Sequence, residues 1–300
     1  MKSPVVVCAG IVTVDAVYLI KGALEEGLKH RASHSYLTTG GCALNAAHAI
    51  ASLGGQAFLS GVVGDDIFGK FVRDELKALR IDGRYLTERA GEATAHSAVL
   101  VDANGERTII NHRSENLYEI GAARVDLQKA SGVLVDTRWP KGAVDLVEAA
   151  RSVGIPCVVD AEAPVNHAAE ALRGATHVAF SEQGLADFAG GADADALSRA
   201  AASLRAWVCV TRGSSSVLCH DGQTLSEVPA FKVKAVDTLG AGDVWHGAFT
   251  LALCEGYGEL EAVTRANAAA ALKTTRIGGG SPLPCKNEVE NFLRETVSCH

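Results

Sequence analysis

A glycine-rich turn followed directly by an acidic residue is the segment best suited to chemistry. Gly240, Ala241 and Gly242 precede an apolar pattern, Val244–Leu253, that predicts a helix, and Asp243 falls in its first turn. The first amides of a helix lack intrahelical partners, and the helix dipole adds about half a positive charge there. Small residues leave these amides uncovered, so the segment predicts an anion site for a transferring phosphoryl group. Asp243 is then a candidate general base, or only a favourable first-turn acid.

A second glycine segment opens another predicted helix. Gly40 and Gly41 stand immediately before the Ala-rich pattern Ala43–Leu53. Two adjacent glycines can act as a hinge between a mobile part and a core. Asn45 is a polar residue in this otherwise apolar helix, so it either satisfies backbone groups or hydrogen-bonds a sugar hydroxyl.

Asp15 is a third candidate. It ends the apolar run Val5–Val14, which we expect to bring it to the carboxyl edge of the first strand. Ligands of open α/β sheets bind outside that edge. A carboxylate there can accept hydrogen bonds from two sugar hydroxyls, and the alternative is a helix cap or turn residue.

The stretch Gly64–Lys70 nearly spells a phosphate-binding loop but lacks its chemistry. The next residue is Phe71, where a Ser or Thr should bind magnesium, and two acidic residues stand where phosphates would lie. We predict instead a strand-to-helix turn with glycine at special backbone angles.

The elements that must position these residues are predicted strands that alternate with predicted helices. Short apolar runs alternate with helical patterns, which favours a mostly parallel sheet covered on both faces. The predicted strands are Val5–Cys8, Ala57–Val63, Gly132–Val135, Pro156–Val159, His177–Phe180 and Ala206–Thr211. The clearest predicted helices are Ala43–Leu53, Phe68–Leu79, Ala143–Val153, Ala241–Cys254 and Leu260–Thr274.

Two regions depart from this alternation of strands and helices. Lys29–Thr38, His96–Val101 and Glu106–Asn111 alternate polar and apolar residues, which is typical of strands with one wet face. We expect residues 29–39 and 95–113 to form a small antiparallel sheet that serves as a lid and excludes water from a phosphoryl donor. The alternative is a surface hairpin without function.

Composition narrows the class of protein. The chain has 300 residues, a net charge of −7 and 48% hydrophobic residues, which predicts a single α/β domain over 1–300 without a nucleic-acid surface. Its eight cysteines form no CxxC pair and lie mostly in apolar runs, so we expect reduced thiols and a cytoplasmic location. No run approaches the ~18 apolar residues of a membrane span, so no membrane partner is expected.

Two of these segments resemble the signatures of the ribokinase, or PfkB, family of carbohydrate kinases. Gly40–Ala47, with Gly54 and Gly64 downstream, is similar to the first signature, and Asp237–Thr250 is similar to the second without a mismatch. The resemblance covers essentially the whole chain. It implies a ribokinase-like three-layer sandwich with a mostly parallel central sheet and a β-sheet lid. The activity it implies is phosphorylation of a small sugar by ATP with Mg²⁺.

The resemblance also implies roles for matching positions. Asp243 would be the catalytic base beside an anion hole of Gly240, Ala241 and Gly242. The sugar would be bound by Asp15, Gly40, Gly41 and Asn45. ATP would lie near Ser181, Thr211, Arg212, Gly213, Gly240, Gly242 and Asn267. Some relatives hold K⁺ at positions that match Asp237, Leu239, Arg276 and Gly278.

One departure concerns magnesium. Many relatives have an Asn-x-x-Glu motif that orders the water molecules around Mg²⁺, whereas Ser181–Gly184 stands here and lacks the glutamate. Glu182 or Asp160 could substitute. The same departure leaves open a sugar-binding relative that has lost turnover, because a fold does not determine function.

The expected sugar is inferred from a more specific similarity, to one kind of kinase within the family. The stretches Gly105–Asn111, Val135–Trp139, Ala179–Leu185 and Pro229–Val233 are similar to sulfofructose kinases and, more distantly, to ketohexokinases. That similarity implies phosphorylation of 6-deoxy-6-sulfofructose at its primary 1-hydroxyl, with the sulfonate bound by Arg138, Lys29 and Asn111. A guanidinium fork suits sulfonate oxygens.

Alternatives for these basic residues stay open. Arg138 could be an ion-pair partner of Asp136 or Glu162, Lys29 could be a solvated lid charge, and the sugar could be neutral, such as fructose or ribose. A nucleoside kinase is disfavoured because Tyr36 is the only aromatic residue in the predicted lid strands. Edge strands of the lid could pair in a homodimer, although a monomer is equally open.

Overall fold

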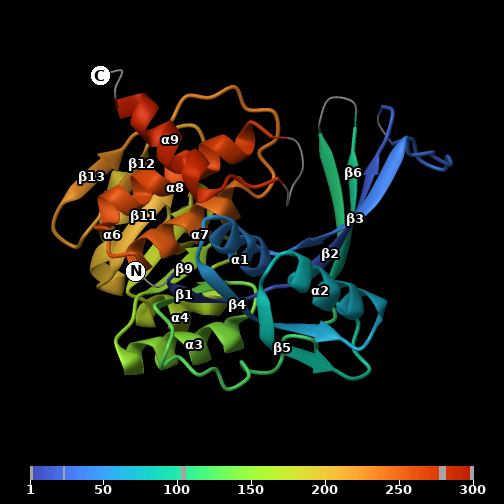
Figure 1. The fold of residues 1–300 in the computed structure, drawn as a ribbon, viewed down its shortest axis with the longest axis horizontal. Coiled ribbons are helices and arrows are strands. Elements are labelled where there is room, and N and C mark those ends of the chain that lie inside the picture. The colour runs from blue at the N-terminus through green and yellow to red at the C-terminus, as the bar shows by residue number, and fades with distance from the viewer. Residues whose placement is uncertain (1–2, 23, 103–105, 277–281, 298–300) are drawn as a thin grey trace.

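The large sheet of the protein is mostly parallel. The computed structural model describes residues 3–22, 24–102, 106–276 and 282–297 (Figure 1). Within them, nine strands form one sheet in the order β13-β12-β11-β10-β9-β8-β1-β4-β5, and only the β11-β12 and β12-β13 pairs are antiparallel. The strands are β1 (Val5–Ala9), β4 (Gln56–Gly64), β5 (Asp82–Arg89), β8 (Gly132–Asp136), β9 (Cys157–Ala161), β10 (His177–Ser181), β11 (Trp207–Thr211), β12 (Val217–His220) and β13 (Leu225–Val228).

Helices cover both faces of this sheet. Alternate residues of β1 face opposite sides, with Val6 and Cys8 in one apolar core and Val7 and Ala9 in the other. The first core is completed by α1 (Cys42–Ser52), α2 (Ile67–Ala78), α7 (Ala241–Cys254), α8 (Glu259–Thr274) and α9 (Lys286–Val297). The second is completed by α3 (Pro140–Val153), α4 (Ala169–Gly174), α5 (Glu182–Ala189) and α6 (Ala194–Leu204), with the short 3-10 turn Asn166–Ala168 beside α4. The three-layer α/β sandwich and the predicted elements, within about three residues at their ends, are confirmed.

A second sheet of four strands stands out from this sandwich (Figure 1). Its order is β3-β2-β6-β7, comprising β3 (His34–Gly40), β2 (Thr13–Leu19), β6 (His96–Val101) and β7 (Arg107–His112). The prediction of a small separate sheet is confirmed, but two details were wrong. The central β2-β6 pair is parallel, so the sheet is mixed, and residues 29–33 form no strand.

The strand β2 also corrects the position of Asp15. The chain leaves the large sheet after Ala9 and enters the small sheet at Thr13, so Asp15 lies within β2 and not at the end of β1. The apolar run Val5–Val14 therefore spans two strands that belong to different sheets.

The Gly64–Lys70 segment is a strand-to-helix turn, as predicted. The Asp66 side chain caps α2 by accepting a hydrogen bond from the Gly69 amide at 2.8 Å. The expected reason for the glycines was wrong, because neither has a positive φ. Close packing requires them instead, since a Cβ on Gly69 would lie 2.2 Å from the Gly64 carbonyl oxygen.

No helix among the described residues is both long enough and apolar enough to cross a bilayer.

Candidate active site

The start of α7 carries little side-chain bulk. Gly240 adopts the left-handed conformation, with φ 72°, and forms the N-cap of the helix without a side-chain cap. The Ala241 amide donates to the Thr238 carbonyl at 3.2 Å, so it is already engaged in the turn. Gly242 is exposed, and a Cβ built on it meets nothing within 4 Å. Of the three predicted anion-hole residues, Gly242 thus has the least obstructed position.

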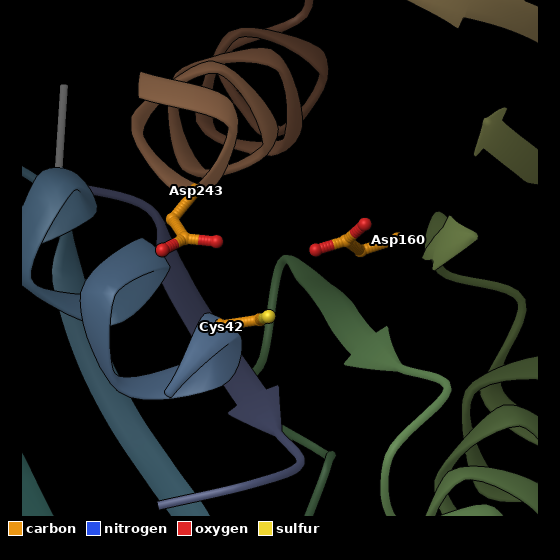
Figure 2. A group of neighbouring side chains, drawn as sticks. All are labelled: Cys42, Asp160 and Asp243. Carbon is orange, nitrogen blue, oxygen red and sulfur yellow. The ribbon is translucent and has the colours of Figure 1, made fainter. Parts of the chain in front are cut away.

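The Asp243 carboxylate lies where three elements meet. The Asn45 side chain on α1 donates from Nδ2 to Asp243 Oδ2 at 2.7 Å. Figure 2 shows the Asp243 carboxylate facing Asp160, from β9, with the thiol of Cys42, from the start of α1, near both. One ligand-type atom from each of Cys42, Asp160 and Asp243 lies within 4.8 Å of the others. Asn45, predicted to bind sugar, here orients the candidate base.

This surrounding sets the proton affinity of Asp243. Burial, and to a smaller extent the nearby Asp160, raise its pKa to about 7, while the hydrogen bond from Asn45 opposes the shift. A carboxylate with a pKa near neutrality is a stronger base than an ordinary aspartate and is still partly ionised at pH 7. The position of Asp243 therefore gives it the chemistry of a general base.

Asp160 is itself part of a buried polar group. Burial, together with the negative charges of Glu162 and Asp136, raises the pKa of its carboxyl group well above the ordinary value. His246 Nδ1, on α7, lies 3.4 Å from Asp160 Oδ2. Burial lowers the pKa of His246, so the imidazole is neutral at pH 7 and forms no ion pair with Asp160 there.

Arg138 and Glu162 form the next layer around the site. Arg138 Nη2 bonds Glu162 Oε2 at 2.9 Å, and Cys42 Sγ lies 4.0 Å from that same oxygen. Asp136 instead accepts hydrogen bonds from the backbone amides of Ile11 and Arg138, at 2.8 and 2.9 Å. The guanidinium partner of Arg138 is therefore Glu162, one of the alternatives considered from the sequence.

These carboxylates fit a hard divalent cation. Asp160, near the end of β9, provides a carboxylate beside Asp243, and Glu162 follows the same strand, so both offer the oxygen ligands that Mg²⁺ prefers. Glu182, the other predicted substitute, is exposed in the first turn of α5. Asp160 and Glu162 are thus better placed than Glu182 to take the role of the missing motif glutamate.

The small sheet brings two of the predicted sugar-binding residues, Asp15 and Asn111, into one row. Asp15 pairs in register with Ser97, and Ser97 pairs with Asn111, whose Nδ2 donates to Ser97 Oγ at 3.1 Å. A Cβ on Gly40 would lie 2.3 Å from Asp15 Oδ2, so the carboxylate rests directly on that glycine. Lys29 lies apart from this row, exposed in the connection between β2 and β3.

Gly41 provides the turn from the small sheet into α1. Its φ is 97°, and a Cβ there would lie 2.3 Å from the Ile11 carbonyl oxygen. A glycine is therefore required at the point where the small sheet joins the helix that carries Asn45.

The predicted nucleotide-binding residues follow the ends of β10 and β11. Ser181 caps α5 by accepting from the Gly184 amide at 2.9 Å, and Thr211 Oγ1 donates to the Phe180 carbonyl at 3.3 Å. Arg212 Nε donates to the Ser216 carbonyl at 2.8 Å, and Gly213 is exposed with φ 58°. These side chains shape the turn, and their role towards a nucleotide stays a prediction.

Asn267 has a supporting role in the fold. Its Oδ1 accepts from Trp245 Nε1 at 2.7 Å, and its Nδ2 donates to the Pro229 carbonyl at 2.9 Å. Both polar groups of this buried side chain are engaged, so it stabilises the walls around α7 and α8. Direct hydrogen bonding to an adenine would require these bonds to change.

The predicted monovalent-cation residues lie where α8 meets the segment before α7. The Leu239 amide donates to Asp237 Oδ1 at 2.9 Å, and Arg276 Nη2 bonds Glu288 Oε1 at 2.5 Å. Gly278 lies outside the described residues.

The site contains three residues to which the sequence gives no site role: Cys42, Glu162 and His246. For Asp160 the sequence suggests only a role as a substitute magnesium ligand. Asp160 had a usable signal, because it ends an apolar strand at the edge where ligands bind. His246 had none, since it is one residue of a helix whose centre is buried all round.

Comparison with known proteins agrees with this site. The profile of the pfkB family of carbohydrate kinases matches residues 4–286. The chain belongs to the pfkB family. It is 32% identical to ribokinase of Bacillus subtilis (strain 168) over 267 residues, covering 85% of this chain and 87% of that protein. It is 28% identical to fructokinase-1 of Oryza sativa subsp. japonica over 323 residues, covering 97% and 98%.

Solved structures support the assignment of the chain to this family. A crystal structure of an Agrobacterium tumefaciens protein, assigned provisionally to the ribokinases, superposes with a TM-score of 0.94 at 32% identity and 99% coverage of both chains. The pfkB protein described here is thus an ATP-dependent carbohydrate kinase, as predicted. These relatives are a ribokinase, a fructokinase and a ribokinase-like structure, so the similarity to sulfofructose kinases stays a prediction.

The raised pKa of Asp243 predicts a pH dependence for this kinase. We expect kcat/KM to fall as pH drops through about 7, because a protonated base cannot accept the proton of the sugar. Asp160→Asn removes the neighbouring negative charge that raises this pKa, so the acidic limb should move to lower pH. Rates measured at saturating Mg²⁺ from pH 5 to 9 test this, with exposed Glu148→Gln as the control. If the acidic limb of the pH profile stays in place in Asp160→Asn, the result would contradict an effect of Asp160 on the pKa of Asp243.

Proposed function

We propose that this pfkB kinase transfers the γ-phosphoryl group of ATP to a sugar hydroxyl, with Asp243 as the general base. The observation that carries the proposal is the start of α7, where the exposed Gly242, with open space at its Cβ position, directly precedes a carboxylate of raised pKa. An acceptor hydroxyl between them would meet its base and its phosphoryl group together.

Different residues of the chain carry out the separate parts of phosphoryl transfer. Asn45 orients the Asp243 carboxylate, which accepts the proton of the attacking hydroxyl. The amides of Gly242 and Asp243 stabilise the charge on the migrating phosphoryl group, aided by the positive end of the helix dipole. Asp160 and Glu162 would hold Mg²⁺, which neutralises charge on the phosphates when it is bound.

The small sheet supplies the sugar-binding side of the site. Gly40 and Gly41 join β3 directly to α1, so a movement of the sheet is transmitted to the helix that carries Asn45. The Asp15–Ser97–Asn111 row offers a carboxylate and two neutral polar groups for sugar hydroxyls. Closure of this sheet would exclude water from the phosphoryl donor.

For the sugar itself, we propose a ketose phosphorylated at its 1-hydroxyl, with 6-deoxy-6-sulfofructose as the specific candidate. Support for the sulfonate comes from Arg138, half-buried beside the acidic group, with Asn111 on the lid row. A neutral sugar is the second candidate. It is supported by the Arg138–Glu162 ion pair, which already neutralises the guanidinium, and by the names of the relatives.

A sugar panel separates these candidates. ADP release would be measured with Mg²⁺ and ATP on sulfofructose, fructose and ribose, for the wild type and for Arg138→Ala. If Arg138 binds the sulfonate, Arg138→Ala raises KM for sulfofructose about 30-fold, a loss of about 2 kcal/mol, and leaves KM for fructose nearly unchanged. An equal change for both sugars contradicts the sulfonate assignment. Tight sugar binding without ADP release under any Mg²⁺ condition contradicts the kinase mechanism.

We further place this kinase in the cytoplasm. The cysteines of the described chain are all unpaired, which suits a reducing compartment. A homodimer through the small sheet stays a prediction, and an equilibrium mass measurement of the purified chain tests it.

A further inference from the structure

A fully buried lysine lies beside the loop that leads into the active-site helix. Lys273 is in the last turn of α8, and its residue exposure is 0%. Its Nζ donates to the Asp237 carbonyl oxygen at 3.2 Å and lies 3.9 Å from Asp237 Oδ2. An ammonium group loses several kcal/mol of hydration when it is buried, so its partners must compensate for that loss. Both of these partner atoms belong to one residue of the loop.

That loop determines where α7 begins. The amides of Val236 and Asp237 both donate to the Thr274 carbonyl, at 2.8 and 3.1 Å, which ties the loop to the end of α8. Asp237 Oδ1 accepts from the Leu239 amide at 2.9 Å, one residue before Gly240. The carboxylate of Asp237 thus bonds the loop on one side and faces the Lys273 ammonium on the other.

We infer that Lys273 is a positioning residue that acts as a built-in cation for the anion site. By holding the carbonyl and carboxylate of Asp237, it sets the path through Leu239 to Gly240, and with it the direction of the first amides of α7. The inference rests on the proposed function, because it assigns to those amides the stabilisation of the migrating phosphoryl group.

The same contacts bear on the monovalent cation that the sequence suggested. K⁺ binds carbonyl and carboxylate oxygens, and the Asp237 oxygens expected to provide such a site already face an ammonium. Two cations at one buried carboxylate would repel each other strongly. K⁺ therefore does not fit at Asp237, and we expect phosphoryl transfer by this chain to be independent of it.

Two substitutions separate positioning from general stability. Lys273→Met removes the charge and fills most of the space, whereas Lys273→Ala also opens room for a small cation. Lys286→Met is the control, because Lys286 makes a half-exposed ion pair with Glu255, at the opposite end of α7 from Gly240. Each protein would be assayed with the active sugar and Mg-ATP in choline chloride, and again in KCl at the same ionic strength.

The expected results are specific to a cation. Wild-type kcat should be the same in both salts, and Lys273→Met should lower kcat about 10²-fold with little change in the KM for sugar, in either salt. Lys273→Ala should be equally impaired in choline chloride and should regain about tenfold or more in KCl or NH₄Cl. If Lys273 had only a structural role, K⁺ would not restore the kcat of Lys273→Ala.

Two outcomes would overturn the inference: marked activation of the wild type by K⁺, or wild-type kcat in Lys273→Met. The wild-type comparison remains decisive if both variants fail to fold. Melting temperatures in the two salts are a second readout, because K⁺ should stabilise only Lys273→Ala. If no sugar is phosphorylated by the wild type, the proposed function fails, whereas the melting temperatures still test the built-in cation.

Discussion

Asp243→Asn should lower kcat for sugar phosphorylation by about 10²- to 10⁴-fold, the range that a positioned general base contributes. The asparagine keeps the size of the side chain and can still accept the hydrogen bond from Asn45, but it cannot take a proton. The KM for sugar should change little, because the substitution leaves the Asp15 row untouched. Initial rates with saturating Mg-ATP measure the effect.

The same variant should be more stable than the wild type, although it is less active. Asp243 has its pKa raised from 3.8 to about 7, so the folded state binds more protons than the unfolded state between those values. Wild-type stability should therefore fall as pH rises through this window, and Asp243→Asn should remove that part of the loss. Melting temperatures at pH 5 and pH 8 test it, with the advantage of the variant expected to be larger at pH 8.

A matched control addresses the alternative that Asp243 only favours a helix start. Asp195 is an exposed acid in the first turn of α6, so Asp195→Asn makes the same substitution in a similar helical setting. It should leave kcat unchanged and should not stabilise the protein. Equal activity of wild type and Asp243→Asn would remove the base assignment.

The large sheet and the start of α7 were predictable because local pattern decides both. Buried parallel strands are continuous apolar runs, and the small residues before Asp243 indicate an uncovered helix start. The strand β2 was not predicted, since Thr13–Leu19 continues the apolar run of β1 with no turn signal apart from Gly10. The separation of the two strands depends on which sheet each one joins, which only tertiary pairing decides.

The surroundings of Asp243 could not be predicted for a different reason. Cys42, Asp160 and His246 come from three elements, and their proximity depends on how α1, β9 and α7 pack together. Lys273 shows the same limit, because a lysine in the last turn of a helix predicts a solvated partner for the helix dipole. Its complete burial beside Asp237 depends on tertiary packing.

Gly242→Val should abolish most activity while leaving the fold intact. A Cβ at Gly242 meets nothing within 4 Å, and the residue lies in the first turn of α7 without a positive φ. Valine is also a better helix former than glycine, so the melting temperature should stay within a few degrees of the wild type. The added methyl groups, however, would stand over the first amides of the helix, where the phosphoryl group must approach. We expect kcat/KM for ATP to fall about 10²-fold.

Gly258→Val is the matched control, because Gly258 starts α8, and a Cβ there also meets nothing within 4 Å. It should retain wild-type activity, which would show that the loss in Gly242→Val depends on position and not on valine at a helix start. The acidic limb of the pH profile in Gly242→Val should stay near pH 7, since Asp243 keeps its neighbours. Wild-type kinetics in Gly242→Val would contradict the assignment of these amides to the phosphoryl group.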